Sequence, residues 1–241
     1  MFIGLDLGTS HLKGIVIDDA QNICAEASFP LNVERPKNSW VEQDPNDWIV
    51  ATENVMASLS VQVKLDQVKA IGLSGQMHGA TILDQNGNVL RPCILWNDTR
   101  SFEEASYLDS KPIFRDLTGN IVFPGFTAPK IAWIKKHEPK IFDQISKVLL
   151  PKDYLRFWLS GEYVAEMSDA AGTSWLDVKK RDWSDDLLAA TGLDRNQMPR
   201  LVEGSEISGL LKGKLAAKAS HISVVVRDKD RIEAICADIV D

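Results

Sequence analysis

The chain has 241 residues, of which 44% are hydrophobic and 25% are charged, a composition typical of a globular protein with a substantial core. A formal net charge of −7 and the absence of a long Lys/Arg run argue against nucleic acid as a partner. The cysteines, Cys24, Cys93 and Cys236, are widely spaced and fit neither a disulfide framework nor a zinc site. Because we find no signal peptide and no membrane-length apolar span, we expect a cytoplasmic protein without a membrane partner.

The N-terminal residues have the pattern of an antiparallel meander. Apolar runs predict strands at 2–7, 12–17 and 23–29. Asp6 lies near the end of the first strand, and Gly8, Thr9 and Ser10 form the turn that follows. The amides and hydroxyls of such a turn can hold a phosphate, and a carboxylate at a strand end can position hydrated Mg²⁺. The alternative is a hairpin in which these side chains only satisfy the turn, and a lone Asp-x-Gly-Thr pattern favours that alternative.

A helix and a fourth strand come next. Asp44 as N-cap and Pro45 at the first helical position begin the helix, which we expect to end near Ser60. Apolar residues at helical spacing between Trp48 and Leu59 predict that one face of this helix is buried. The fourth strand is expected at 68–73.

The stretch 72–79, where this strand gives way to a loop, is rich in glycine, which permits close approach of the backbone to a bound molecule. It presents Gln76, Met77 and His78 at a strand end, where open α/β folds bind ligands. The alternative is an ordinary turn that contains a satisfied histidine. A hairpin with an Asn-Gly turn is expected over 80–90.

A short strand then leads into a mixed cluster of side chains. The indole of Trp96 can stack on the C–H face of a sugar, while Asn97, Asp98 and Arg100 can bond its hydroxyls. Equally, Asp98 or Thr99 can cap the helix that runs through 103–108. The sequence leaves both interpretations open.

The remaining elements follow from similar local patterns. We expect a helix after 125–130, a strand at 147–150, a helix at 151–160 that Gly161 ends, a small-residue loop at 167–175, and a helix from Ser184 to Gly192. We find no internal repeat and no low-complexity tract.

Seven motifs together resemble the N-terminal domain of the FGGY carbohydrate kinases, over about residues 1–215. They are Phe2-Ile-Gly-Leu-Asp-Leu-Gly-Thr-Ser10 and the stretches 39–45, 75–81, 94–98, 124–130, 149–155 and 167–173. Gln-Met-His at 76–78 resembles the motif of the members that phosphorylate xylulose, whereas glycerol kinases have Gln-Arg-Glu at the same place.

The resemblance implies a ribonuclease-H-like α/β domain of the actin and hexokinase type, with a mixed sheet and flanking helices. It implies a sugar-binding domain at 1–220 and an atypical tail at 221–241, where the family's second, ATP-binding domain would begin. It further implies ATP as co-substrate, Mg²⁺ as metal, and the transfer of the γ-phosphoryl group to the 5-hydroxyl of D-xylulose. We also expect a homodimer.

The resemblance also assigns residue roles. Asp6 would organise the metal, by way of water, and be critical for activity. Gly8, Thr9 and Ser10 would form the phosphate turn. Met77 and His78 would be the main sugar contacts, with Trp96 and Asn97 lining the same pocket.

The C-terminal residues depart from the family pattern. A strand at 222–226 would place Asp230 where the family has its catalytic aspartate. However, Arg227, Asp228 and Lys229 replace the glycines that normally precede it, and bulky charged residues restrict approach to a phosphate. We therefore favour a surface charge over a catalytic base for Asp230.

Three functions remain open: the sugar-binding half of a kinase, a sugar-responsive module without catalysis, and an actin-like structural domain. Another FGGY sugar or polyol kinase is an alternative to the first. Because positioning both substrates supplies much of phosphoryl-transfer catalysis, we expect the 241-residue chain alone not to phosphorylate xylulose at a useful rate.

Overall fold

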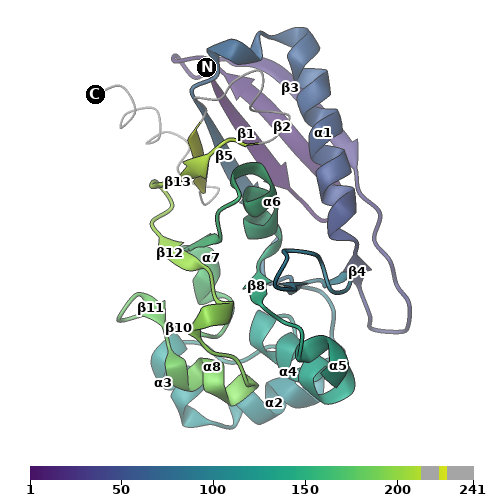
Figure 1. The fold of residues 1–241 in the computed structure, drawn as a ribbon, viewed down its shortest axis with the longest axis vertical. Coiled ribbons are helices and arrows are strands. Elements are labelled where there is room, and N and C mark those ends of the chain that lie inside the picture. Colours follow the sequence, from purple (N-terminus) through teal and green to yellow (C-terminus); the bar gives the residue numbers. More distant parts are fainter. Residues whose placement is uncertain (213–222, 227–241) are drawn as a thin grey trace.

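The computed structural model describes residues 1–212 and 223–226, and its framework is a six-stranded mixed sheet (Figure 1). In spatial order the strands are β13 (Ile207–Leu210), β14 (Ser223–Val226), β5 (Ala70–Gly75), β1 (Phe2–Leu7), β2 (His11–Ile17) and β3 (Ile23–Pro30). The first three strands in the chain pair antiparallel, whereas β5 is parallel to β1 and β14 is parallel to β5. An antiparallel meander extended by parallel strands is the ribonuclease-H-like topology, so the expected fold class is confirmed.

Side-chain alternation along β1 divides the sheet into two faces. Ile3, Leu5 and Leu7 are buried, and they pack in one core with the helices α1 (Pro45–Gln62) and α6 (Pro151–Ser160). α1 contacts β2 and β3, while α6 contacts β5 and β14. Successive side chains in a strand point to opposite faces. Asp6 is therefore on the face turned away from these two helices, near the end of β1.

The first helix forms for the reasons that its sequence indicates. The Asp44 carboxylate accepts a hydrogen bond from the Asn46 backbone N–H at 2.9 Å, and Pro45 occupies the first helical position. The expected apolar stripe from Trp48 to Leu59 is buried against the sheet. This confirms the predicted helix, which ends at Gln62.

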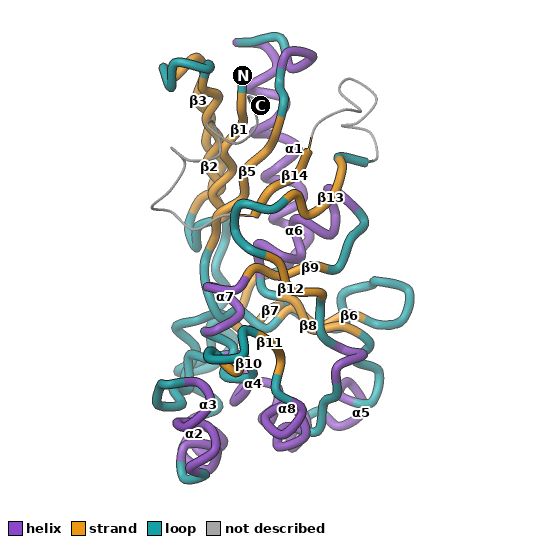
Figure 2. Tube along the Cα trace, turned by 90° about the vertical axis from the view of Figure 1, so that its left-hand side faces the viewer, coloured by secondary structure: helices purple, strands orange, loops and turns teal. Residues whose placement is uncertain are grey.

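A second group of elements lies beyond one end of the sheet, as Figure 2 shows. Its helices are α2 (Phe102–Asp109), α3 (Pro112–Thr118), α4 (Thr127–His137), α5 (Pro139–Phe142), α7 (Met167–Ala171) and α8 (Asp185–Thr191). Short strand pairs connect it to the sheet: β4 (Glu42–Gln43) with β7 (Cys93–Ile94), β6 (Thr81–Leu83) with β8 (Lys147–Leu149), β9 (Val164–Glu166) with β12 (Arg200–Val202), and β10 (Leu176–Asp177) with β11 (Asp182–Trp183). Single 3₁₀ turns occur at Leu65–Gln67 and Arg195–Gln197.

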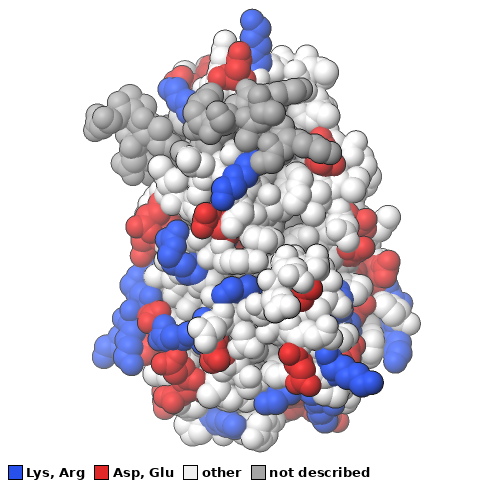
Figure 3. Space-filling view, in the orientation of Figure 1, with Lys and Arg blue, Asp and Glu red and all other residues white. Residues whose placement is uncertain are grey.

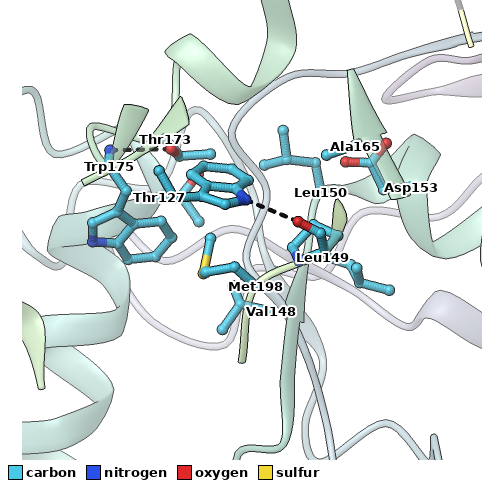
Figure 4. Close-up of a pocket in the computed structure, with 11 residues that line it drawn as sticks. Thr127, Val148, Leu149, Leu150, Asp153, Ala165, Thr173, Trp175 and Met198 are labelled. Carbon is cyan, nitrogen blue, oxygen red and sulfur yellow. Dashed lines mark hydrogen bonds between the residues drawn. The ribbon is translucent and has the colours of Figure 1, made fainter. Parts of the chain in front are cut away.

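The second group has its own apolar core, and a small pocket in it is shown in Figure 4. Val148, Met198 and Trp175 line this pocket, and the Thr173 hydroxyl accepts a hydrogen bond from the Trp175 backbone N–H. Its volume of about 10 Å³ is no more than one water molecule needs. We therefore assign this pocket to core packing.

The expected boundary between strand and loop is wrong in the glycine-rich stretch. The strand runs from Ala70 to Gly75, because Gly72 and Gly75 continue the parallel ladder with β1. The loop is therefore only 76–79. The expected hairpin over 80–90 is present, because Leu83 bridges Val89 and the Leu90 N–H donates to the Ile82 carbonyl at 3.0 Å. Its first strand, β6, also pairs with β8.

The stretch 167–175 was expected to be a loop, but it begins with the helix α7. The Glu166 carboxylate accepts from the backbone N–H groups of Ser168 and Asp169, at 3.0 and 2.6 Å, and so caps this short helix. An acidic cap was not recognised in the sequence. None of the helices in the described part of the chain is long and apolar enough to cross a membrane.

Candidate active site

A polar cavity of about 210 Å³ opens where β5 ends, with room for several waters or a small polar molecule. Met77 and His78 reach it from the loop after β5, Lys152 from α6, and Ser168 and Asp169 from α7. Two of the residues predicted to bind sugar are thus brought together in one cavity. It lies at the carboxyl end of a parallel strand, where α/β folds bind ligands.

The backbone of His78 is held in an unusual conformation. Its φ angle is 62°, in the left-handed region that few residues other than glycine adopt. Its carbonyl oxygen accepts from the Thr127 hydroxyl at 3.2 Å and from the Lys130 ammonium at 2.9 Å. The buried Lys130 also donates to the Gly125 carbonyl at 2.5 Å. Helix α4 therefore fixes the loop, and Lys130 is a positioning residue that the sequence interpretation missed although it ends the 124–130 motif.

The imidazole of His78 lies between an aromatic ring and a glycine. Its centroid is 4.6 Å from that of Phe126, and a Cβ added to Gly172 would lie only 2.3 Å from its Cε1. Burial, with a smaller contribution from the Lys130 charge, lowers the pKa of His78 to about 4. The ring is therefore neutral at pH 7, with one nitrogen that donates and one that accepts, as recognition of a hydroxyl requires.

Gly172→Ala is expected to displace the His78 ring, because the α-helical φ of Gly172 (−74°) admits alanine but the space does not. If the cavity binds the sugar that the resemblance implies, its affinity for that sugar should fall by roughly tenfold. The free energy of unfolding should fall by about 1–3 kcal/mol, which is the usual cost of overpacking a site. Calorimetry and thermal unfolding measure the two effects. Gly4→Ala is the control, since its Cβ would meet only Ile15 side-chain atoms at 3.3 Å or more. Unchanged sugar affinity in Gly172→Ala would contradict the assignment.

Lys152 and Asp169 of the cavity lining belong to an ionic cluster. The Lys152 ammonium lies 3.0 Å from an Asp153 oxygen and 2.5 Å from an Asp169 oxygen. Burial by itself lowers the pKa of Lys152, but the two carboxylates outweigh it and raise that pKa above its usual value. Burial raises the pKa of Asp169, although Lys152 opposes this shift. Lys152 and Asp169 were not predicted as site residues, although they lie in the 149–155 and 167–173 motifs, because only the tertiary fold, in which α6 and α7 both contact β9, brings them together.

Asp6 lies beyond the cavity lining, on β1 in register with Lys13 of β2 and Ser74 of β5. Within the residues that the structure describes, no cluster of three or more His, Cys, Asp or Glu side chains could hold a metal directly. A single carboxylate fits Mg²⁺, which usually keeps several waters and binds proteins through one or two acids. The donor set is therefore compatible with the metal role predicted for Asp6.

The turn after β1 uses part of its hydrogen-bonding capacity internally. The Gly8 N–H donates to the His11 carbonyl at 3.0 Å, and a Cβ at Gly8 would lie 2.9 Å from that oxygen. The Thr9 hydroxyl donates to the Gln76 side chain at 3.1 Å. The backbone N–H groups of Thr9 and Ser10 donate to no other residue in the described ranges. These two amides are therefore the groups that could face a phosphate.

The cluster after β7 separates into two parts. Asp98 and Arg100 form a buried ion pair at 2.7 Å, so neither is free to bond a sugar. Helix α2 begins after Ser101, so the expectation that Asp98 or Thr99 caps it is wrong. Trp96 is 44% exposed, and its indole N–H donates to the Thr9 hydroxyl at 3.1 Å.

Trp96 therefore lies beside the turn, and neither Trp96 nor Asn97 belongs to the lining of the cavity. The Asn97 Oδ1 atom is buried and has no hydrogen-bond partner among the described residues. Asp230, the remaining predicted site residue, lies outside the described residues.

Comparison with known proteins identifies the family. Residues 1–236 match the N-terminal domain of the FGGY family of carbohydrate kinases. The chain is 54% identical to xylulose kinase from Escherichia coli over 217 residues, which is 90% of this chain and 45% of that protein. It thus spans about half the length of the curated relatives that it matches.

Solved structures give the same result. A Brucella ovis crystal structure described as a xyloylose kinase is 56% identical, with a TM-score of 0.90 over 93% of this chain and 47% of that one. Xylulose kinase from Rhodospirillum rubrum is 28% identical, with a TM-score of 0.89 over 94% of this chain and 48% of that one. The chain therefore belongs to the FGGY family of carbohydrate kinases, of which it contains the N-terminal domain.

Proposed function

We propose that this chain is the sugar-binding part of a kinase that transfers the γ-phosphoryl group of ATP to the 5-hydroxyl of D-xylulose. The observation that carries the proposal is the polar cavity at the end of β5, which contains both Met77 and His78. The names of the relatives, which are xylulose kinases, support the same substrate.

The side chains of the cavity suit a polyol. The Ser168 hydroxyl donates its proton to the Glu166 carboxylate at 2.7 Å, so only its oxygen is left to accept. A neutral imidazole at His78 and a carboxylate at Asp169 supply further acceptors, and the imidazole and the Lys152 ammonium supply donors. Met77 adds apolar surface against the carbon chain. Such convergent polar groups orient a small ligand.

Outside the cavity, Asp6 would hold the waters of Mg²⁺, and the amides of Thr9 and Ser10 would bond phosphate oxygens. Mg-ATP, when bound, supplies the phosphoryl group and neutralises its charge. Asp6 lies on β1, which adjoins β5, and the turn directly follows β1, so the protein could hold both substrates at the same end of these two parallel strands. We also infer a cytoplasmic location. We further infer a homodimer, which size-exclusion chromatography would test.

His78→Ala should weaken D-xylulose binding by roughly one to two powers of ten, because an unsatisfied hydroxyl in a buried site costs about 1–3 kcal/mol. Calorimetry on the purified chain measures the change. His137→Ala is the matched control, since His137 stacks on Trp133 at 4.8 Å at the far end of α4. Equal affinity of the wild type and His78→Ala would remove His78 from the site. Tighter binding of glycerol than of D-xylulose would instead favour another sugar or polyol kinase.

A further inference from the structure

A row of hydrogen-bonded side chains links β4, the loop after β5 and the turn after β1. Gln43 of β4 accepts, through its Oε1 atom, from Trp48 Nε1 at 3.1 Å and from Gln76 Nε2 at 2.7 Å. Gln76 Oε1 accepts from the Thr9 hydroxyl at 3.1 Å, and the Thr9 oxygen accepts from Trp96 Nε1 at 3.1 Å. Both glutamines are buried, with 1% and 8% of their surface exposed.

The groups that bond Gln43 determine which atom donates and which accepts in each bond of the row. Gln43 Nε2 donates to two backbone carbonyls, those of Thr9 at 2.7 Å and Asn32 at 2.9 Å. Carbonyls only accept and an indole N–H only donates, so the Gln43 amide cannot be flipped without loss of three bonds. Its Oε1 atom must therefore face Gln76 Nε2.

The remaining bonds follow from this first one. With Nε2 of Gln76 directed at Gln43, its Oε1 atom faces Thr9 and can only accept, so the Thr9 hydroxyl must be the donor. The lone pairs of Thr9 are then free to accept from the Trp96 indole. The hydroxyl proton of Thr9 is consequently committed to the protein and is not available to a phosphate.

This row connects two predicted sites that are far apart in the sequence. Thr9 belongs to the candidate phosphate turn, whereas Gln76 directly precedes Met77 and His78 of the candidate sugar loop. The Gln76 backbone N–H also donates to the Leu7 carbonyl at 2.7 Å, which ties the loop to the end of β1. A shift of the loop therefore changes the position of Thr9, and Thr9 in turn holds the indole of Trp96.

We propose that Gln43 and Gln76 are positioning residues that transmit occupancy of the sugar cavity to the phosphate turn and to Trp96. Gln43 holds the orientation of the Gln76 amide, and Gln76 passes a displacement of the loop to the Thr9 hydroxyl. Sugar binding then sets the geometry in which the turn meets a phosphate. This inference rests on the proposed function, because it assumes that D-xylulose enters the cavity.

The test is nuclear magnetic resonance of the chain labelled with ¹⁵N, with D-xylulose as the probe. The indole N–H signal of Trp96, assigned with Trp96→Phe, reports the far end of the row. We expect the signal to shift on sugar addition in the wild type and in Thr9→Ser, which keeps the hydroxyl. In Thr9→Val and Gln76→Met, which remove the bonds, we expect the shift to fall by half or more. Sugar affinity should fall by about tenfold in both of these variants and by less than about threefold in Thr9→Ser.

Each other outcome overturns the inference. An equal shift in the wild type and Thr9→Val would mean that sugar contacts Trp96 directly. No shift in a wild type that binds D-xylulose would mean that the row transmits nothing. Failure of the wild type to bind D-xylulose, seen in the same titration by calorimetry, would instead refute the proposed function. Should Thr9→Val not fold, Gln76→Met gives the same comparison, and the backbone spectrum of each variant shows whether it is folded.

Discussion

Arg100→Met should lower the free energy of unfolding by about 3–5 kcal/mol, because it would leave the buried Asp98 carboxylate without a cation and remove one of the two cations that pair with Glu42. The Arg100 guanidinium lies 2.7 Å from oxygens of both Asp98 and Glu42, and only 1% of its side chain is exposed. It also stacks over the Trp40 ring at 3.8 Å, a contact that methionine would replace only in part.

The desolvation of the two carboxylates makes this loss large. The Asp98 side chain is fully buried, and its remaining partners are the backbone N–H groups of Val41 and of residue 100. Glu42 keeps Arg91 at 2.6 Å. A buried ion pair adds little net stability, but removing one partner leaves a charge that the interior cannot solvate.

Thermal unfolding measures the effect, and the midpoint should fall by about 6–20 °C for a chain of this size. Lys69→Met is the control, since the Lys69 and Asp19 side chains are 48% and 59% exposed and such a pair contributes about 0–1 kcal/mol. A midpoint for Arg100→Met that matches this control would show that the cluster around Arg100 is not a structural anchor.

Asp6→Asn should lower turnover by about 10²- to 10³-fold, or about 2.7–4 kcal/mol of barrier, while D-xylulose affinity changes by less than about threefold. The change preserves the shape of the side chain but removes the charge proposed to hold the metal waters. The assay requires a nucleotide-binding half. We suggest a chimaera that joins this chain to the remaining half of its 54% identical Escherichia coli relative.

The control for Asp6→Asn is Asp19→Asn, which makes the same chemical change in an exposed residue paired with Lys69. Coupled ADP release measures turnover, and calorimetry measures sugar affinity. A loss in turnover of less than about tenfold, or 1.4 kcal/mol, would favour the hairpin-turn interpretation of Asp6. Equal losses in turnover and sugar affinity would place Asp6 in the sugar site instead.

Much of the fold could be predicted because its determinants are local. The cap at Asp44, the proline after it and the apolar spacing from Trp48 to Leu59 all agree on one helix. The strands at 2–7, 12–17 and 23–29 follow from equally local patterns. Local patterns failed at Ser74 and Gly75, which were expected in the loop but belong to β5 because they continue its parallel ladder with β1. Strand pairing of this kind is a tertiary effect that overrides the preference of glycine for turns.

The site was predictable only in part, for the same reason. Met77 and His78 belong to one short motif, and both line the cavity. Lys152 and Asp169 meet only in the tertiary fold, where α6 and α7 both contact β9, and no local pattern indicates that ion pair. Asp98 and Arg100 looked like sugar ligands because composition does not reveal burial.

The missing side chain of Gly172 has a consequence for attempts to change the substrate of this protein. The His78 ring occupies the place where a Cβ at position 172 would stand. Directed evolution that varies position 172 alone should therefore recover glycine in nearly every active clone. A small residue at position 78 would release the constraint, so a library that randomises the two codons together should reach sugar preferences that neither single-site library contains.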